Sequence, residues 1–535
     1  MTRFRKAALV GALAVPAVAG GFIVQERSTR EGAQLLDQVM SLVSTRFVDT
    51  VRANELYEKA ARGLVTQLQD PYTELLSPAQ LKSFNTNTGG RYGGLGMQIE
   101  EQPGKGVTVS RVFPHTPAER GGVREGDVIV GIDTLSTRGP TWNTRKVSDL
   151  LTGTPGTKVN VSFARPGVAE PIKSTFTRAT IKVPAVPYAI VLDGKVGYLP
   201  LQQFNESTTE DIIAAVTRFQ REGAKGLVLD LRSNPGGFLD QALAVSNLFL
   251  QQGQEIASVR GRSGDEQRYT AREKPIAPDI PMVILTDQYS ASASEIVAGA
   301  LQDHDRAVII GTTSFGKGLV QTLFNLDGGY ALKMTTAKWY TPSGRSIQKE
   351  RKLNADGIFV EVHPDSVESD SAKRARPVYK SDAGRVVYGG GAITPDIIIR
   401  PDTLTTPEQN FRKAIAPKSQ EFYVALYDFA MEQKGKVRPD FQVQPAWREA
   451  LWSRLQKAGV TVDRATYDGA SRYVDRLIET RVALTAFGDS TAKRRTLDED
   501  VQLVRALEIL KKGGTQRDLF ALVPTQQPRQ QPQRD

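Results

Sequence analysis

Three serines that alternate with alanines form the part of the sequence best suited to nucleophilic chemistry. Ser290, Ser292 and Ser294 lie in the run YSASASE, next to an apolar pattern that predicts a helix over 294–303. A serine at a helix start lies in the positive field of the helix dipole, which favours negative charge on an attacked carbonyl oxygen. The N–H of Ala293 would point to the same place. The alternative is that the serines cap the helix, an interpretation that suits Ser290 and Ser294. Spacing alone does not choose among the three.

A lysine further along the chain is the candidate base. Lys317 lies in the stretch GTTSFGKG, residues 311–318. Burial can lower the pKa of a lysine, about 10.4 in water, by several units, and a neutral amine can take a proton from a serine hydroxyl. Two alternatives are a solvent-facing lysine and a phosphate-binding loop, G-x-x-x-x-G-K-[ST]. Gly318 weakens the second, because it replaces the hydroxyl that would bind magnesium.

Residue types for other chemistries are scarce. The chain has no cysteine, which excludes disulfides, cysteine-ligated zinc and a thiol nucleophile. Its three histidines are His115, His304 and His363. None is well placed for a triad, although His304, at the polar end of the helix after Ser292, is not excluded. Serine attack with a lysine base needs no metal or cofactor, and we expect neither.

A glycine turn follows a predicted strand in LVLDLRSNPGG, residues 227–237. Adjacent glycines after a strand allow backbone N–H groups to face an open space and stabilise an oxyanion. Taken alone, the segment favours the plainer interpretation of a strand followed by a tight turn.

Around these motifs, strand-like and helical stretches alternate over residues 195–346, which implies an α/β layer fold. The predicted strands are 195–199, 226–231, 282–285 and 308–310, with 397–399 as the last, and the predicted helices are 208–220, 238–251 and 294–303. Residues 93–182 contain short β-branched runs separated by glycine and aspartate turns, with one helix over 143–151, and predict a small β-rich module.

The bulk composition limits the class of protein. The chain has 535 residues, 40% hydrophobic and 24% charged, with a net charge of +10. This length predicts several domains. The basic charge is not gathered into runs interleaved with aromatics, so we expect no nucleic-acid binding.

The N-terminus predicts export. Arg3, Arg5 and Lys6 precede an uncharged run over 7–24, typical of a signal peptide or a short membrane anchor. Residues 17–19 offer a cleavage site, and the run is near the lower length limit for a membrane span. We expect a periplasmic or cell-envelope location, with cleavage and anchoring both open. A buried helix is the alternative.

Together the motifs resemble those of the carboxyl-terminal processing proteases, also called tail-specific proteases. The resemblance covers roughly residues 35–400 and keeps the family's order. It rests on DPYT (70–73), GGLG (93–96), DLRSNPGG (230–237), SASASE (290–295), FGKG (315–318) and TPSGRS (341–346). It implies a catalytic core of the Clp-protease/crotonase type.

The resemblance also implies the roles of individual residues. Ser292 is the nucleophile, Lys317 the general base, and Gln321 orients the lysine. The oxyanion donors are the N–H groups of Ala293 and Gly236. Substrate would be cleaved near its C-terminus through an acyl-enzyme.

Two further roles follow from the resemblance. The β-rich module resembles a PDZ domain, whose carboxylate-binding loop would use Gly93, Gly94, Leu95 and Gly96 to bind apolar, unstructured protein C-termini. Asp303 matches an acidic position that supports activity in the family.

We therefore expect an α+β multidomain protein. Its predicted parts are a signal or anchor (1–24), an N-terminal helical region (31–90), a PDZ-like domain (91–182), a peptidase core (183–402, insertion 349–390), a C-terminal helical region (407–522) and a disordered tail (524–535). The helical region and the insertion depart from the family's usual pattern, and a second copy or an adaptor is the expected partner of the helices. The competing hypotheses are a non-catalytic peptide-binding scaffold and a nucleotide-binding protein.

Overall fold

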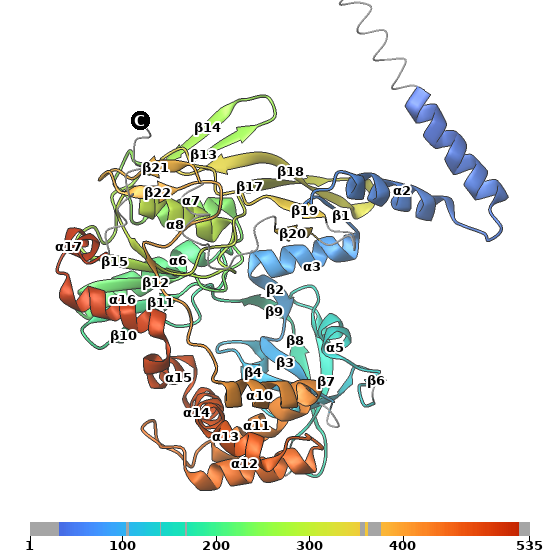
Figure 1. The fold of residues 1–535 in the computed structure, drawn as a ribbon. Coiled ribbons are helices and arrows are strands. Elements are labelled where there is room, and N and C mark those ends of the chain that lie inside the picture. Colours follow the sequence, from blue (N-terminus) through green and yellow to red (C-terminus); the bar gives the residue numbers. More distant parts are fainter. Residues whose placement is uncertain are drawn as a thin grey trace, which may run out of the picture. The chain divides into compact units, whose positions relative to one another are not determined.

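The computed structural model describes residues 31–102, 106–139, 141–165, 168–353, 359–361 and 376–523 (Figure 1). The described chain divides into two compact units. One contains the residues up to Leu81 together with Gln321–Thr335, and the other contains the remainder. The predicted signal or anchor at 1–24 and the predicted disordered tail at 524–535 lie outside the described residues.

The first unit is built from helices and a short sheet. Residues 31–46 are helical, and α2 (Ala53–Gln67) and β1 (Glu74–Leu76) follow. β1 pairs antiparallel with the start of β18 (Ala331–Tyr340). The DPYT motif is a turn in which the Asp70 carboxylate accepts hydrogen bonds from Tyr72 N and Thr73 Oγ1. None of the described helices is long and apolar enough to cross a membrane.

The β-rich module begins after α3 (Pro78–Gly89) and contains a six-stranded antiparallel sheet. Its elements are β3 (Met97–Gln102), β4 (Gly106–Val112), α4 (Pro117–Arg120), β5 (Val128–Ile132), β6 (Leu135–Ser136), α5 (Thr144–Leu151), β7 (Lys158–Ala164) and β8 (Ile172–Thr177). Strands β2 (Arg91–Gly94) and β9 (Ala179–Lys182) pair where the chain enters and leaves it. The helix predicted over 143–151 is confirmed as α5, whose Val147 is fully buried in the module's core.

The core of the second unit is a six-stranded, mostly parallel sheet in the order β10-β11-β12-β15-β16-β23. The strands are β10 (Ile190–Leu192), β11 (Val196–Pro200), β12 (Gly226–Asp230), β15 (Met282–Thr286), β16 (Val308–Gly311) and β23 (Ile397–Ile398). Helices α6 (Thr208–Arg221), α7 (Leu239–Asn247) and α8 (Ala293–Asp303) cover one face. The five strands and three helices predicted from apolar patterning are confirmed, with ends shifted by a few residues.

The described chain has further strands that do not belong to this sheet. They are β13 (Glu255–Gly261), β14 (Glu266–Thr270), β17 (Leu319–Asn325), β19 (Arg351–Leu353), β20 (Phe359–Glu361), β21 (Val378–Lys380) and β22 (Val386–Tyr388), with a 3₁₀ turn at Asp327–Gly329. The predicted insertion thus contains two small hairpins, β19–β20 and β21–β22. Residues 354–358 and 362–375 of this insertion lie outside the described residues.

The C-terminal helices divide into two groups, one with its own apolar core and one that packs on the central sheet. Helices α10 (Thr406–Ile415), α11 (Ser419–Gln433), α12 (Pro445–Lys457), α13 (Arg464–Gly469) and α14 (Ser471–Phe487), with a 3₁₀ turn at Ala416–Lys418, share an apolar core of their own. After α15 (Asp489–Arg495) and a 3₁₀ turn at Leu497–Glu499, α16 (Val501–Lys512) and α17 (Gln516–Ala521) return to the central sheet. Leu503, Leu507 and Leu510 of α16 pack against Val228 and Val283 on the face opposite α8 (Figure 1). The region predicted as one helical unit therefore also supplies a layer of the catalytic core.

Candidate active site

Three adjacent parallel strands end together and bring the sequence motifs to one place. Asp230 at the end of β12 is paired with Leu285 of β15, which is paired with Ile310 of β16. The glycine turn follows β12, the serine run follows β15, and the Lys317 stretch follows β16. Because the carboxyl ends of parallel strands lie at one edge of a sheet, residues distant in sequence converge there.

Ser292 has a backbone conformation that distinguishes it from its neighbours. It is the residue before α8, with φ 55° and ψ −112°, a region that non-glycine residues rarely adopt. Such strain costs about 1–3 kcal/mol and occurs most often at functional sites. The N-terminus of α8 begins at Ala293, which is buried. The helix dipole therefore acts where Ser292 would attack.

The two flanking serines are not helix caps, contrary to the sequence-based interpretation. Both are fully buried. The Ser290 hydroxyl donates to the Leu231 carbonyl at 2.8 Å, and the Ser294 hydroxyl donates to the Asn234 carbonyl at 3.0 Å. Both hydroxyls therefore hydrogen-bond the nucleophile segment to the glycine turn. Because these two hydroxyls have structural partners, Ser292 remains the candidate nucleophile.

The buried carboxylate of Glu295 connects the serine segment to the lysine segment. Its Oε2 accepts hydrogen bonds from the backbone N–H of Ser292 at 2.8 Å and of Lys317 at 2.9 Å. Its Oε1 accepts from the Ser314 hydroxyl at 2.5 Å and from Gly316 N at 2.7 Å. The backbone nitrogens of Ser292 and Lys317 therefore lie within two hydrogen-bond lengths of each other, joined through one oxygen atom.

Burial raises the pKa of the Glu295 carboxyl, because the side chain has no exposed surface. The four hydrogen bonds from Ser314, Lys317, Gly316 and Ser292 oppose this shift, because they favour the ionised form. Three of the four donors are backbone N–H groups, which can only donate. This donor set therefore suits a carboxylate, which has acceptor capacity on both oxygens.

The glycine turn packs directly on the nucleophile segment. A Cβ added to Gly236, whose φ is 96°, would lie 2.7 Å from the Ala291 carbonyl oxygen and 2.9 Å from Ser292 Cβ. Only glycine allows this approach. The N–H of Gly236, a predicted oxyanion donor, donates at 2.9 Å to Oδ1 of Asn234. This donor is therefore already engaged within its own turn.

The segment around Lys317 is held by contacts to its main chain. Trp339 Nε1 donates to the Lys317 carbonyl at 3.1 Å, and Gly318 N donates to Gln348 Oε1 at 2.8 Å. The lysine side chain is half-buried. Phe315 N donates to the Ser290 carbonyl at 3.0 Å, which again joins the lysine and serine segments.

The other predicted site residues lie on different elements. Gln321 is on β17 in the first unit, where its Nε2 lies 3.4 Å from Thr335 Oγ1. Asp303 ends α8, about 16 Å of helix rise from Ser292 at 1.5 Å per residue. Its carboxylate pairs with Arg345 at 2.7 Å, and both side chains are buried.

His304 lies at the same distant end of α8. Its Nδ1 contacts Asp382 at 2.7 Å and its Nε2 contacts the Glu255 carbonyl at 2.6 Å. Both ring nitrogens are thus occupied away from Ser292. His304 is therefore not a base for this serine.

A cavity lies between the β-rich module and the core residues next to it. Its volume is about 340 Å³, and Tyr92, Leu95, Gly96, Ile99 and Leu151 are among the residues that line it. The cavity follows the edge between β3 and α5. Burial raises the pKa of the Tyr92 phenol to about 12.

The four predicted peptide-binding residues divide into two pairs. Leu95 and Gly96 line the cavity. Gly93 and Gly94 instead belong to β2, opposite Thr180 and Ala179 of β9. The structure therefore places two of the four residues at the cavity and two in the β2–β9 pair, and the role of all four in binding a carboxylate stays a prediction.

Comparisons with known proteins agree with this architecture. The sequence model of peptidase family S41 matches residues 195–365, that of the PDZ domain matches 108–165, and that of the activating protease CtpB N-terminal domain matches 23–77. A carboxy-terminal-processing protease of Bartonella bacilliformis is 41% identical over 328 residues, 60% of this chain and 74% of that protein. The chain belongs to the carboxy-terminal-processing protease family.

Other relatives have similar coverage. The carboxy-terminal processing protease CtpA of Bacillus subtilis is 33% identical over 347 residues, 64% of this chain and 73% of that protein. Among solved structures, a photosystem II D1 C-terminal processing protease is 29% identical, with a TM-score of 0.37 over 68% of this chain and 86% of that chain. The family match, the PDZ-domain match and the two curated relatives show that this chain is a serine-type peptidase with a PDZ domain, and they confirm the α+β multidomain fold class expected from its sequence.

In this protease the phosphate-binding interpretation of the Lys317 stretch is disfavoured. The stretch leads into strand β17, whereas a phosphate-binding loop leads into a helix. The N–H groups of Gly316 and Lys317, which would face a phosphate, donate to the carboxylate of Glu295. A buried carboxylate therefore occupies the position that an anionic ligand would need.

Sequence reasoning missed two residues that organise the protease site. Glu295 was visible as the last letter of SASASE, three residues after Ser292, which is the spacing of a helix capping box. Gln348 gave no signal, because its contact with Gly318 depends on a loop that returns from 30 residues away. Only the first could have been found from local spacing.

Proposed function

We propose that the protease cleaves proteins near their C-termini through an acyl-enzyme on Ser292, with Lys317 as the general base. One observation carries the proposal: the Glu295 carboxylate holds the backbone of both residues through a single oxygen atom. The strained conformation of Ser292 and the close approach of Gly236 support the same assignment.

In the proposed acylation step, neutral Lys317 takes the hydroxyl proton of Ser292 while its Oγ attacks the scissile carbonyl carbon. The carbonyl oxygen gains negative charge and accepts hydrogen bonds from the N–H groups of Ala293 and Gly236. For the second bond, Gly236 releases or shares its hydrogen bond with Asn234.

The carbon–nitrogen bond then breaks, and the leaving amine takes the proton from Lys317. In deacylation a water molecule gives a proton to Lys317 and attacks the ester carbonyl. The carbon–oxygen bond to Ser292 breaks, its Oγ recovers the proton, and a new C-terminal carboxylate leaves. Gln321 orients the lysine in this proposal, and Asp303 supports the site indirectly through Arg345.

Substrate tails are proposed to bind in the cavity lined by Leu95 and Gly96. Apolar residues from β3 and α5 suit apolar side chains, and backbone N–H groups near Gly96 suit a terminal carboxylate. A peptide would then add as a strand along β3. The protein substrates in this proposal have apolar, unstructured C-termini.

The test uses a fluorophosphonate probe and a substrate with an apolar tail. Wild type should gain the mass of the probe on Ser292 and release a C-terminal fragment. Ser292→Ala and Lys317→Ala should each lose cleavage by at least about 10³-fold without a change in circular dichroism. Ser453→Ala is the matched control, because it removes an exposed hydroxyl that donates to the Glu449 carbonyl within α12, and this variant should still be labelled.

Labelling of any other residue, or cleavage by Ser292→Ala at the wild-type rate, would refute the assignment. Binding of the tail peptide without cleavage by wild type would favour the scaffold hypothesis instead.

We also propose that residues 1–24 direct export to the periplasm or cell envelope, on the basis of Arg3, Arg5, Lys6 and the apolar run that follows. N-terminal sequencing of the mature protein in each cell fraction distinguishes a cleaved signal from a retained anchor. Recovery of the intact chain in the cytoplasm alone would contradict the proposal. A second copy or an adaptor remains the proposed partner of the C-terminal helices, and light scattering of the purified protein tests the first of these.

A further inference from the structure

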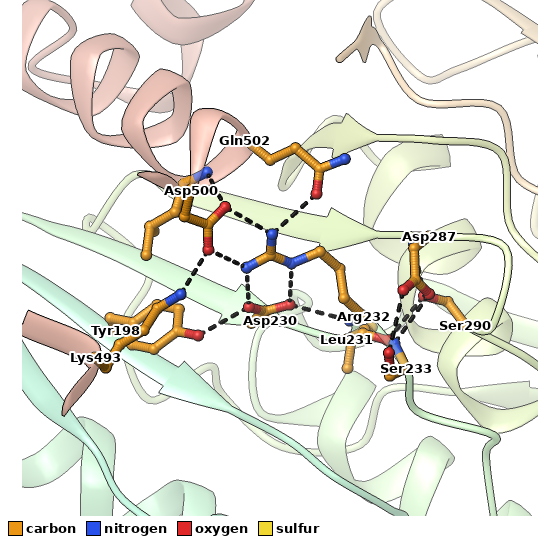
Figure 2. A network of polar contacts seen from close by, with 11 residues as sticks. Tyr198, Asp230, Leu231, Arg232, Ser233, Asp287, Ser290, Lys493, Asp500 and Gln502 are labelled. Carbon is orange, nitrogen blue, oxygen red and sulfur yellow. Dashed lines mark hydrogen bonds and ion pairs between the residues drawn. The ribbon is translucent and has the colours of Figure 1, made fainter. Parts of the chain in front are cut away.

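A single arginine joins the start of the glycine turn to the C-terminal helices. Arg232 lies two residues after Asp230, the last residue of β12. The Arg232 side chain is 19% exposed. Figure 2 shows its guanidinium between Asp230 on one side and Asp500 and Gln502 on another. An arginine has five N–H donors in a fixed planar arrangement. In Arg232 all five have partners.

The partners divide between the catalytic sheet and the C-terminal segment. Asp230 accepts from Nε at 2.9 Å and from Nη2 at 2.6 Å. Asp500 accepts from Nη1 and Nη2, both at 2.8 Å, and Gln502 accepts from Nη1 at 2.9 Å. Three of the five hydrogen bonds therefore go to residues about 270 positions further along the chain.

The residues that hold Arg232 are themselves fixed. Asp500 caps α16 by accepting from Leu503 N at 3.1 Å, and it also pairs with Lys493. Gln502 donates to the Ile399 carbonyl at 2.7 Å. Two carboxylates and two cations thus neutralise each other in a site that is largely shielded from water.

The electrostatics agree with a charged, ordered cluster. Burial opposes ionisation of Asp500, but the hydrogen bonds and charges of Arg232 and Lys493 outweigh it and hold the pKa of this carboxyl well below its usual range. Burial likewise opposes the charge of Arg232, and its pKa is nevertheless raised by Asp230 and Asp500. Asp500 is therefore ionised at neutral pH, as the paired cluster requires.

The backbone that follows Arg232 forms the oxyanion turn. Ser233 has a φ of 57°, a left-handed conformation, and its N–H donates at 2.9 Å to Asp287. The carbonyl of Leu231 accepts from the Ser290 hydroxyl. The turn is thus held by the nucleophile segment on one side and by the C-terminal helix, through Arg232, on the other (Figure 2).

We propose that Asp500 and Gln502 are positioning residues for catalysis, which fix the oxyanion turn through Arg232 so that Gly236 meets the developing charge. The inference rests on the proposed role of Ser292 and of this turn. It assigns a role in catalysis to the segment 489–512. This segment lies outside the three regions matched by the family models, which are 23–77, 108–165 and 195–365.

The test is Asp500→Asn in the full chain. Asparagine keeps the shape and part of the hydrogen bonding, but it removes the charge and places an N–H₂ group against a guanidinium that can only donate. A misplaced oxyanion donor lowers kcat and leaves substrate binding intact. We expect kcat and the rate of fluorophosphonate labelling to fall about 10- to 100-fold, with KM within about twofold of wild type.

Thr515→Ala is the matched control. Thr515 caps α17 in the same C-terminal segment by accepting from Asp518 N, and no contact joins it to Arg232. A purely structural role of the helix caps predicts similar losses of thermal stability and of activity in both variants. The proposal predicts that, at a temperature where both variants are fully folded, kcat falls in Asp500→Asn and stays at the wild-type value in Thr515→Ala, although loss of a buried carboxylate lowers the thermal stability of Asp500→Asn more.

A second variant covers the case in which Asp500→Asn does not fold. Gln502→Leu removes one of the five acceptors without leaving an unpaired carboxylate, and it should lower kcat about 3- to 10-fold. A folded variant at either position with wild-type kcat and labelling rate overturns the inference. Absence of labelling on Ser292 in the wild type would instead refute the proposed function, so the two failures are distinguishable.

Discussion

Replacing Glu295 by glutamine tests whether this side chain holds the nucleophile and the base together. The change keeps the size of the side chain but converts one acceptor oxygen into an N–H₂ group. If the amide nitrogen replaces Oε2, the backbone N–H groups of Ser292 and Lys317 both lose their acceptor. If it replaces Oε1, Gly316 N loses its acceptor and the Ser314 hydroxyl must reverse its role.

The second arrangement costs less, and its magnitude can be bounded. One buried N–H without an acceptor costs about 1–3 kcal/mol. Against this, glutamine avoids burying a charge, which is also costly. The two effects partly cancel, so we expect the free energy of unfolding at neutral pH to change by less than about 2 kcal/mol.

The activity should change more than the stability. Displacement of a catalytic group by about 1 Å can lower the rate by 10²-fold, or roughly 2.7 kcal/mol in the activation free energy. We therefore expect kcat of Glu295→Gln to fall by about 10²-fold, measured on a peptide with an apolar tail.

The pH dependence gives a second readout. Burial raises the pKa of Glu295 above the ordinary value of 4.5 for a glutamate, so the folded protein holds this proton more tightly than the unfolded chain does. The contribution of this group to stability is fully present below pH 4.5 and is lost as the pH rises through the raised pKa. Glutamine removes this dependence, so the variant should gain stability relative to wild type as the pH rises through that window.

Glu408→Gln is the matched control, because Glu408 is a buried glutamate in the same capping position at the start of α10. It should change stability without changing kcat. Retention of kcat within about threefold in Glu295→Gln, or an equal loss in the control, would refute the reasoning.

Two further variants probe the surroundings of the dyad. Gly236→Ala places a Cβ 2.7 Å from the main chain of the nucleophile segment, at a φ of 96°. We expect kcat to fall by about 10²-fold or more. An alanine variant with wild-type kcat would show that the turn is not an oxyanion site. Asp303→Ala leaves the buried guanidinium of Arg345 without its carboxylate, so the free energy of unfolding should fall by about 3–5 kcal/mol. Urea unfolding measures this free energy. A loss under about 1 kcal/mol would mean that water or another group replaces the carboxylate.

The sequence was sufficient for the elements that are set by local patterning. Buried parallel strands such as β12 and β15 are short apolar runs, and α8 follows one of them with a regular apolar face. Ser292 could be singled out only by resemblance, because three serines share the same local spacing. The structure separates them through the left-handed φ of Ser292 and the carbonyl partners of the other two, and neither property is encoded in spacing.

Long-range contacts account for what sequence reasoning missed. The pairing of Arg232 with Asp500 joins residues 268 positions apart, and nothing near Asp500 distinguishes it from an ordinary helix cap. Helix α16 did carry a local signal, since Leu503, Leu507 and Leu510 form an apolar stripe. An apolar stripe identifies the buried face of a helix but not the element that this face packs against. The sequence therefore predicts α16 only as part of the C-terminal helical region.

The position of α16 at the far end of the chain sets the order in which the protease can be completed. The sheet strands β12, β15 and β16 are synthesised well before the helix that covers one of their faces. At about 5–20 residues per second, the ribosome needs roughly ten seconds to one minute to pass from Arg232 to Asp500. Once Lys317 has been synthesised, the nascent chain carries the serine and the lysine but not yet the acceptors that complete the guanidinium cluster. On the proposed role of this cluster, the oxyanion turn is held in place only after α16 has been synthesised and has packed on the sheet.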